Sequence, residues 1–262
     1  MLVSSVNLPF LEVQELVNAC EREGVEVWVV TDFIRTTIAR AEFDELGGHP
    51  LLIFKSTPGD AWQLLVKRIV DLVASVAGLV VLSLLYAGLA IAIRLDSPGP
   101  ILFTQQRSGR RGRKFTMLKF RSMVDNAAMR QNELAAFNIM SGPVFKVEND
   151  PRITRVGAFL RRTSLDELPQ LWNVLLGDMS LVGPRPLPVY ETEKFQDLAH
   201  RRRLSVKPGL TGLWQIRGRN EVREFKDWVK LDLEYIDNWS IWLDFKIMAE
   251  TVPIVLQGLG AK

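Results

Sequence analysis

The stretch LVASVAGLVVLSLLYAGLAIAI, residues 72–93, contains no charged side chain. As a helix it would be about 33 Å long, which is enough to cross a hydrocarbon core of roughly 30 Å. A core helix of a soluble enzyme is the other interpretation, but such a helix usually keeps a polar face, and this run has none. The run therefore predicts a membrane helix, which we place at about residues 67–94.

The flanks of this run bear on how it enters the membrane. A Lys-Arg pair at 67–68 precedes it, and Arg94 closes it. Basic residues favour the cytoplasmic side, so one straight crossing would put one basic end on the wrong side. A re-entrant segment satisfies both ends, with Gly78, Ser83 and Gly88 as places to bend. Composition alone leaves the spanning and the re-entrant arrangements open.

Overall composition narrows the class of protein. The chain has 262 residues and a formal net charge of +3, enough length for one large domain or two small ones. Its one cysteine, Cys20, excludes an intrachain disulfide. The two histidines, His49 and His200, lie far apart in the sequence, which argues against a zinc site of the Cys/His type. A hard cation held by carboxylates and phosphate fits this composition.

The first sixty residues have a different pattern from the rest. Residues 8–24 have the periodicity of an amphipathic helix that a glycine closes. Residues 25–30 and 50–54 are predicted to be short buried strands, with a helix over about 32–46 between them. This order predicts a β-α-β segment, too small for a complete nucleotide-binding fold and without a glycine-rich phosphate loop.

A basic, glycine-punctuated segment follows the apolar run. Residues 101–106 and 114–123 are predicted to be strands, joined by the loop SGRRGRK. The stretch 105–121 carries basic residues and no acidic one. It suits an electrostatic anchor for anionic lipids, at about 1 kcal/mol per basic residue, or a phosphate-binding surface that includes Lys119 and Arg121. A nucleic-acid partner is not expected, because no recognition motif is present.

Two adjacent carboxylates, Asp166 and Glu167, lie in the stretch TSLDELPQLW, residues 163–172. Ser164 and Glu167 match a capping box, which predicts that they cap the N-terminus of a helix. The same place suits chemistry, because backbone donors and the helix dipole stabilise an ionised carboxylate. An ionised aspartate can attack phosphorus, while its neighbour holds a divalent metal. Nearby arginines that could neutralise phosphate oxygens are Arg152, Arg155, Arg161, Arg162 and Arg185.

Four motifs in this order carry a resemblance to a known family. They are KRIVDLVAS (67–75), LDSPGPILFTQQRSGRRGRKFTMLKFRSM (95–123), NDPRITRVGAFLRRTSLDELPQLWNVLLGDMSLVGPRP (149–186) and KPGLTGLWQIRGRN (207–220). Together they resemble the bacterial sugar transferases, the monotopic phosphoglycosyl transferases, over about three quarters of the chain. The resemblance implies an α/β, mostly helical monotopic membrane enzyme over residues 61–262, with an N-terminal re-entrant membrane helix hairpin. A partial Rossmann-like βαβ segment and linker, residues 1–60, would precede it.

The resemblance also implies a reaction. Members transfer a sugar 1-phosphate from a UDP-sugar to undecaprenyl phosphate and release UMP. They work at the cytoplasmic face of the bacterial inner membrane, among membrane lipids, and need Mg2+, with Mn2+ as an alternative. The reaction is the first membrane step of exopolysaccharide, capsule or O-antigen assembly. Larger members are suspected homodimers and carry transmembrane helices upstream, so the resemblance implies a shortened form, natural or engineered.

Roles for individual residues follow from the same resemblance. Asp166 corresponds to the nucleophile that forms a covalent phosphosugar intermediate, and Glu167 belongs to the metal site together with Asp166. The arginines matched to positions near the bound phosphates or the nucleotide-sugar are Arg152, Arg185, Arg217 and Arg219. For each of these arginines a structural ion pair is the alternative.

One departure from the family concerns the membrane helix. Many members have a proline directly after a serine in mid-helix, whereas Leu84 follows Ser83 here. The bend must then come from Ser83, Gly78 or Gly88, or be shallower. The chemistry is unaffected by this departure.

The last predicted elements and the rival functions complete the expectations. Residues 224–260 predict amphipathic helices, whose Trp228, Trp239 and Trp242 fit either a membrane interface or the core. A non-catalytic membrane scaffold for glycan assembly is one alternative function, and a basic protein that binds anionic lipid is another. Both lack a use for the Asp166–Glu167 pair, and neither would release UMP.

Overall fold

The computed structural model divides the chain into two compact units, Met1–Ser56 and Thr57–Lys262. It describes residues 2–4, 10–24, 28–30, 40–46, 49–55, 61–140, 142–145, 147–195, 197–217 and 224–257. Arg219, one of the predicted substrate-binding residues, therefore lies outside the described residues.

The described residues of the first unit form two small sheets and one helix. β1 (Leu2–Ser4) and β2 (Trp28–Val30) pair in parallel, and α1 (Phe10–Glu23) connects them along the chain. β3 (Arg40–Leu46) and β4 (His49–Lys55) pair antiparallel. The predicted amphipathic helix is confirmed, as are strands within the two predicted strand regions.

The predicted helix over residues 32–46 is wrong in its second half, which is strand β3. Residues 32–39 lie outside the described part of the chain. The strand forms because Ala41 and Phe43 alternate with acidic residues, which is a period of two and not of 3.6. Two glycines separate this stretch from β4 in the sequence, which is a hairpin signal. The β-α-β order accordingly starts at β1.

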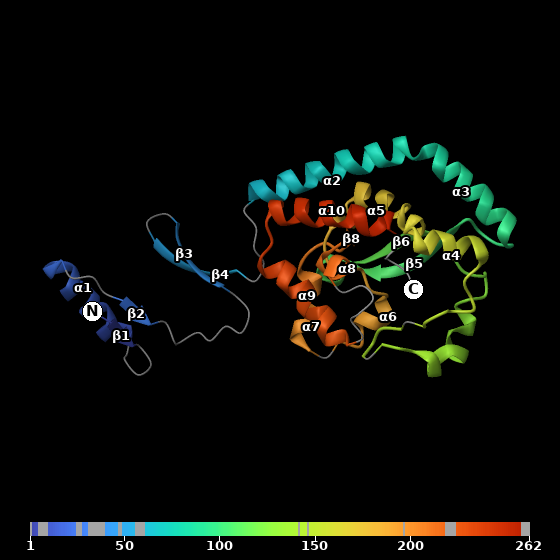
Figure 1. The fold of residues 1–262 in the computed structure, drawn as a ribbon. Helices are drawn as coiled ribbons and strands as arrows, with labels where there is room; N and C mark the ends of the chain where they lie inside the picture. Colours follow the sequence, from blue (N-terminus) through green and yellow to red (C-terminus); the bar gives the residue numbers. More distant parts are fainter. Residues whose placement is uncertain are drawn as a thin grey trace. The chain divides into compact units, whose positions relative to one another are not determined.

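Helices dominate the second unit, as predicted (Figure 1). Its strands form an antiparallel ribbon, β5 (Leu102–Ser108) with β6 (Lys114–Phe120), and a short parallel pair, β7 (Ser180–Val182) with β8 (Gly209–Thr211). Its helices are α2 (Ala61–Val81), α3 (Ser83–Asp96), α4 (Arg155–Arg162), α5 (Gln170–Leu176), α6 (Val189–Thr192), α7 (Leu198–Arg202), α8 (Leu213–Arg217), α9 (Phe225–Asp237) and α10 (Ile241–Leu256). Short 3₁₀ turns cover Arg110–Gly112, Met129–Phe137, Leu165–Glu167 and Arg203–Ser205. The ribbon confirms both strands predicted in the basic segment.

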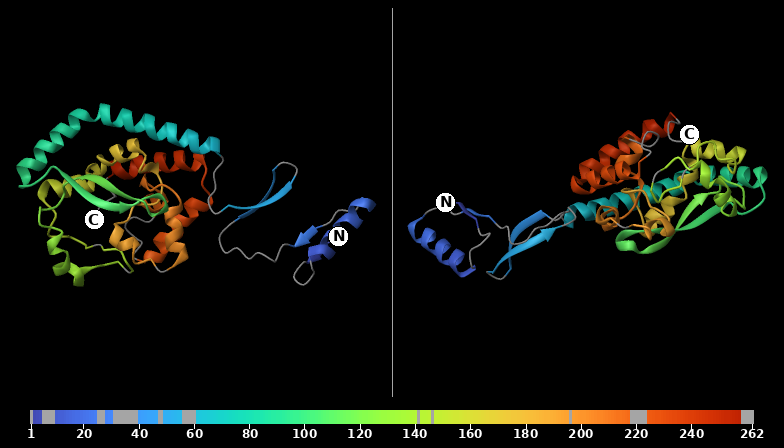
Figure 2. Two further views of the ribbon diagram at one scale, coloured as in Figure 1. Left: turned by 180° about the vertical axis from the view of Figure 1, so that it is seen from behind. Right: turned by 90° about the horizontal axis from the view of Figure 1, so that it is seen from below.

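The apolar run forms a bent rod of two helices, α2 and α3, along one side of this unit (Figure 1). Seen from behind, the β5–β6 ribbon runs beneath the rod (Figure 2). The bend measures 61° and lies at Leu82, beside Ser83, which is one of the three positions that the sequence left open for it. Leu82 has φ −89° and ψ 6°, so its ψ is far from that of an α-helix, and no proline is involved. Among the described helices none alone has the length and apolar character to cross a bilayer, whereas this bent pair taken together meets both criteria.

Buried polar contacts fasten both halves of the rod to the unit. On α2, Arg68 donates to two carbonyl oxygens at the end of α5, both at 2.8 Å. At the end of α3, Arg121 donates to the carbonyl oxygens of Ile93 at 3.3 Å and Ser97 at 2.6 Å. Asp96 accepts from the backbone N–H of Val156, in the first turn of α4, at 3.1 Å. These contacts satisfy backbone groups that helix ends leave without intrahelical partners.

The three C-terminal tryptophans divide between the core and the surface, and a membrane interface stays a prediction for the exposed one. Trp228 is only 4% exposed and packs in a core cluster that includes Phe225. Trp239 packs against a second cluster, beneath α9 and α10. Trp242 is 77% exposed, like several apolar side chains of the rod, of which Leu84 is 86% exposed. The unit therefore combines a conventional core with an apolar outer surface.

Gly157, on α4, gives a first testable prediction. A Cβ at this position would lie 2.0 Å from the backbone oxygen of Ser122. We expect Gly157→Ala to destabilise the protein by about 2 kcal/mol, because α4 must move away from the end of β6. The apparent melting midpoint, followed by tryptophan fluorescence in detergent, should fall by about 5 °C.

Gly88, on α3, offers a matched control for this prediction. A Cβ there would meet nothing within 4 Å, so Gly88→Ala should leave the midpoint unchanged or slightly raised. Equal midpoints for the two variants would mean that α4 moves away from Ser122 at no cost.

Candidate active site

The carboxylate pair lies on the 3₁₀ turn Leu165–Glu167, between α4 and α5. Both side chains belong to buried residues, with Asp166 7% and Glu167 8% exposed. The predicted capping box is wrong, because the Ser164 side chain makes no capping hydrogen bond. Ser164 has a left-handed backbone with φ 56°, and its N–H donates to Arg161 O at 3.1 Å, so it ends α4. Pro169 then stands at the start of α5, where a proline is tolerated.

Two cations from distant elements meet the pair. Lys119, on β6, lies with its Nζ 2.8 Å from Glu167 Oε1 and 3.9 Å from Asp166 Oδ2. Arg185, three residues beyond β7, lies with its Nη2 3.2 Å from the same Glu167 oxygen. The structure thus brings together four of the residues predicted from the sequence.

Burial makes the charges of this cluster depend on one another. Burial raises the pKa of the Asp166 carboxyl, and the nearby Lys119 opposes that shift. Burial lowers the pKa of the Lys119 amine, and Glu167 opposes that shift. The pKa of Asp166 and that of Lys119 each depend on the neighbouring charges, so loss of one group changes the pKa of the other.

A pocket of about 210 Å³ opens beside Glu167, Lys119 and Arg185. Arg107, on β5, lines it and donates from Nη1 to Pro186 O at 2.9 Å. Burial lowers the pKa of Arg107 to about 10. With three basic side chains in its wall the pocket suits an anionic ligand such as a phosphate ester.

Gln170 and Arg107 are pocket residues that the sequence analysis did not select. Gln170 is 2% exposed and follows Glu167 by three positions, so both point to one side of the chain as it enters α5. That spacing was a usable signal for Gln170. The basic stretch contained Arg107 among many similar residues, without a feature to single it out.

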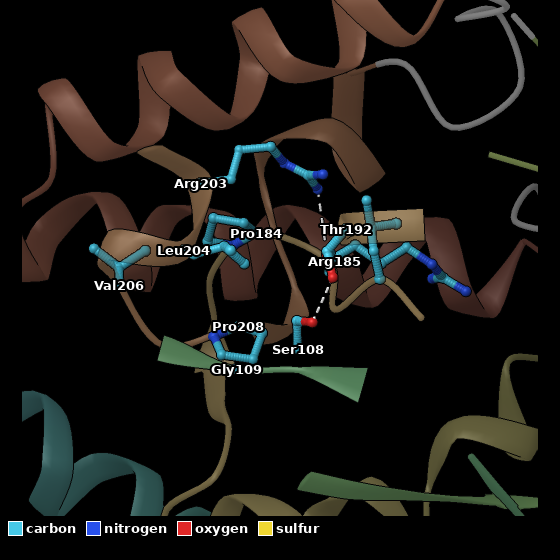
Figure 3. Close-up of a pocket in the computed structure, with 10 residues that line it drawn as sticks. Ser108, Gly109, Pro184, Arg185, Thr192, Arg203, Leu204, Val206 and Pro208 are labelled. Atoms are coloured by element: carbon cyan, nitrogen blue, oxygen red, sulfur yellow. Dashed lines mark hydrogen bonds between the residues drawn. The ribbon is translucent and has the colours of Figure 1, made fainter. Parts of the chain in front are cut away.

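A second hollow, of about 250 Å³, shares Arg185 with the first pocket (Figure 3). Arg203 donates from Nη2 to the backbone oxygen of Arg185 at 3.3 Å. The hydroxyl oxygens of Ser108 and Thr192 lie 2.6 Å apart and join β5 to α6. The first contact holds the Arg185 backbone, and the second holds α6, which follows it along the chain.

Aromatic stacking fixes the Arg185 side chain as well. Its guanidinium lies 5.7 Å from the ring centroid of Trp214, which stacks on Trp228 at 4.4 Å. Arg203 lies over the other ring of this stack, 5.3 Å from the Trp228 centroid. Trp214 belongs to the motif KPGLTGLWQIRGRN, so this motif reaches the site through a tryptophan.

The remaining predicted arginines have other partners. Arg152 is 5% exposed, bonds to Asp150 Oδ2 at 2.6 Å and donates to a backbone oxygen at 2.9 Å. Arg121 closes the end of α3, as described above. Arg217 pairs with Glu234 on the surface at 2.7 Å. None of the three lines the pocket beside Glu167, and contact with substrate stays a prediction for them.

The carboxylate pair fits a magnesium ion whose other ligands come from a substrate phosphate and from water. No group of three or more metal-ligating His, Cys, Asp or Glu side chains occurs among the described residues. Mg2+ commonly takes one or two carboxylates and completes its shell with substrate phosphates and water. Asp166 and Glu167 offer hard oxygen donors of this kind next to a basic pocket. Without a phosphate ligand, the two carboxylates would supply only part of the coordination shell of the ion.

Comparison with known proteins identifies the family of this chain. The family model described as bacterial sugar transferase matches residues 62–258. The chain is 42% identical to galactosyl transferase CpsE of Streptococcus agalactiae, over 98% of this chain and 58% of that protein. It is 46% identical to undecaprenyl-phosphate galactose phosphotransferase of Salmonella typhimurium, over 74% of this chain and 41% of that protein. It is 39% identical to UDP-glucose:undecaprenyl-phosphate glucose-1-phosphate transferase of Escherichia coli, over 92% of this chain and 51% of that protein.

These matches identify the family of the chain and show how much of each relative the chain covers. The chain spans about half the length of the curated relatives it matches. The family model covers most of the second unit, including the rod, the carboxylate pair and the residues that hold Arg185. The chain therefore belongs to the bacterial sugar transferase family.

Proposed function

We propose that this protein transfers a sugar 1-phosphate from a UDP-sugar to undecaprenyl phosphate and releases UMP. The observation that carries the proposal is the buried Asp166–Glu167 pair, held by Lys119 and Arg185 at a basic pocket. Two of the similar proteins are named for transfer of a sugar phosphate to undecaprenyl phosphate, and one of these names includes UDP-glucose. A scaffold or a lipid-binding protein would not need this arrangement of charges.

The proposed reaction proceeds in two displacements at one phosphorus atom. An Asp166 carboxylate oxygen attacks the phosphorus that carries the sugar, and the bond from that phosphorus to the UMP oxygen breaks. An oxygen of undecaprenyl phosphate then attacks the same phosphorus and displaces Asp166. Both nucleophiles react as anions, so neither step needs a general base.

The side chains around the pair supply the electrostatic part of the reaction. Lys119, Arg185 and Arg107 offset the negative charge of the diphosphate and of the two carboxylates. Burial raises the pKa of Asp166, and Lys119 opposes that shift, which favours the ionised nucleophile. Glu167, with Asp166 beside it, is the place for Mg2+, which would supply further charge neutralisation to the transferring phosphoryl group.

A membrane location follows from the lipid acceptor and from the apolar surface. Large exposed apolar side chains line the rod and continue onto α5 and α10, with Leu95 82%, Trp172 48% and Trp242 77% exposed. Exposed patches of this extent mark interaction with lipid or with other proteins. We place the rod in the cytoplasmic face of a bacterial inner membrane as a re-entrant hairpin, so that the acceptor phosphate reaches the pocket from the bilayer.

Release of UMP tests the proposal. The detergent-solubilised chain is incubated with Mg2+, undecaprenyl phosphate and, in turn, UDP-glucose, UDP-galactose and UDP-acetamido sugars. We expect release with one or a few donors, loss of release on chelation, and recovery when excess Mg2+ is added. Absence of release with every donor, from folded protein that binds liposomes, would favour the scaffold function.

A further inference from the structure

The N-terminal half of α2 carries two charged side chains, Lys67 and Asp71, that are largely shielded from solvent. Asp71 is 3% exposed, and the Lys67 side chain is 15% exposed. Burial of an ionised group is costly unless it is paired and hydrogen-bonded, so such groups need a structural or functional reason. Their partners indicate the reason.

Both side chains bind the backbone of β7. An Asp71 carboxylate oxygen accepts from the backbone N–H of Leu181 at 2.9 Å and from the Ser180 hydroxyl at 3.1 Å. The Lys67 amine donates to the backbone oxygen of Val182 at 2.9 Å. β7 therefore receives hydrogen bonds from α2 in addition to those of its partner strand β8.

The Lys67 amine is itself held from the far side. It lies 2.5 Å from Asp244 Oδ2, on α10. The Tyr235 hydroxyl donates to Val182 O at 3.1 Å and to Asp244 Oδ1 at 2.9 Å, depending on its rotation. Helices α2, α9 and α10 thus converge on the last residue of β7.

The chain from β7 to Arg185 has little freedom. Gly183 N donates to Thr211 O at 2.9 Å, and Gly209 N donates to Pro184 O at 2.9 Å. Gly183 has no room for a side chain, because a Cβ would lie 2.5 Å from Lys207 O. A shift of β7 is therefore passed on to Arg185, whose guanidinium contacts Glu167 at 3.2 Å.

We infer that Lys67 and Asp71 are positioning residues for the reaction, which hold β7 so that Arg185 stays on Glu167 at the pocket. The apolar rod is then a working part of the active site as well as an attachment to lipid. This inference rests on the proposed function, because its kinetic test needs turnover. It predicts that the rod cannot be replaced by another membrane anchor without loss of rate.

The test compares Asp71→Val with Asp71→Asn in the full chain, in the background of wild type and of Arg185→Lys. Valine removes the acceptor of Leu181 N–H, whereas asparagine keeps an oxygen there. We expect Asp71→Val to lower kcat for UMP release about 100-fold, and Asp71→Asn to recover most of it, since small misplacements of catalytic groups cost about this much. In the Arg185→Lys background, Asp71→Val should lower kcat by less than about 3-fold. Asp71 and Arg185 would both act through the contact between Arg185 and Glu167, which Arg185→Lys already disturbs.

Arg68→Met is the matched control from the same helix. It removes two hydrogen bonds to the end of α5 and none to β7. Hydrogen exchange of the Leu181 amide should be at least about tenfold faster in Asp71→Val, and unchanged in Arg68→Met. This readout needs no turnover and therefore stands apart from the proposed function.

The outcomes separate the two ideas. Equal loss of rate from Asp71→Val in both backgrounds, with wild type active, would overturn the positioning role and leave the proposed function intact. An unchanged Leu181 exchange rate would overturn it as well. A wild-type protein without UMP release would overturn the proposed function, and the kinetic role of Asp71 with it.

Discussion

Asp166→Asn should lower UMP release by at least about three orders of magnitude, the size of effect seen when a covalent nucleophile is removed. Asparagine has nearly the same shape, so Lys119 and the pocket should stay in place, but it lacks the charge that attacks phosphorus. Initial rates of UMP formation at saturating donor measure the effect. Asp178→Asn, a carboxylate change in the same motif at a residue outside the Asp166–Glu167–Lys119–Arg185 cluster, should retain the wild-type rate.

A second readout of the same variant isolates the first chemical step. Without undecaprenyl phosphate, wild type should release UMP in a burst of about one equivalent and retain a labelled sugar phosphate on the protein. Asp166→Asn should show neither burst nor label. Glu167→Gln should slow the burst and still give label on Asp166. Label on the Asp166→Asn protein would assign the nucleophile to another residue.

Asp232→Leu is expected to have the largest effect on stability. Asp232 and Arg203 are 2% and 4% exposed, and their Oδ2 and Nε lie 2.6 Å apart. Loss of one partner of a buried pair costs about 3–5 kcal/mol, because a charge is left without compensation. Arg203 cannot shed its proton, whereas burial already raises the pKa of Asp232 to about 6. The apparent melting midpoint should fall by about 10 °C.

The double variant Asp232→Leu with Arg203→Met is the control for that prediction. Apolar side chains of similar volume often replace a buried pair at little cost, so the midpoint should recover most of the loss. UMP release should not recover to the same extent, because the Arg203→Met change also removes the hydrogen bond from Arg203 to the Arg185 backbone. A double variant as unstable as the single one would mean that the pair itself contributes to stability.

Local pattern predicted the parts of the site that lie close together in the sequence. The adjacent carboxylates, the β5–β6 ribbon and the bend beside Ser83 each follow from a few neighbouring residues. The capping box failed even so, because its pattern is the same whether Ser164 starts one helix or ends another. The predicted helix over residues 32–46 failed over its second half, where the alternation of Ala41 and Phe43 with acidic residues is a strand signal.

The arginines were harder to assign because their partners come from distant segments. Arg121 and Arg152 stand in long family motifs, yet their donors bind the end of α3, Asp150 and a backbone oxygen. A guanidinium recognises carbonyl oxygens as well as phosphates, and sequence does not reveal which will face it. For the same reason the motif 207–220 directed attention to Arg217, whereas Trp214 contacts Arg185.

The bend of the rod is braced on both sides. Arg68 ties α2 to α5 before the bend, and Arg121 with Asp96 ties the end of α3 after it. We therefore expect the angle of 61° to stay fixed when the rod is in lipid. A rod of fixed angle cannot tilt to match the thickness of its surroundings, so with the rod in lipid, the bilayer must thin or thicken around it. Turnover in vesicles of increasing acyl-chain length should accordingly pass through a narrow optimum, set by the shape of the protein.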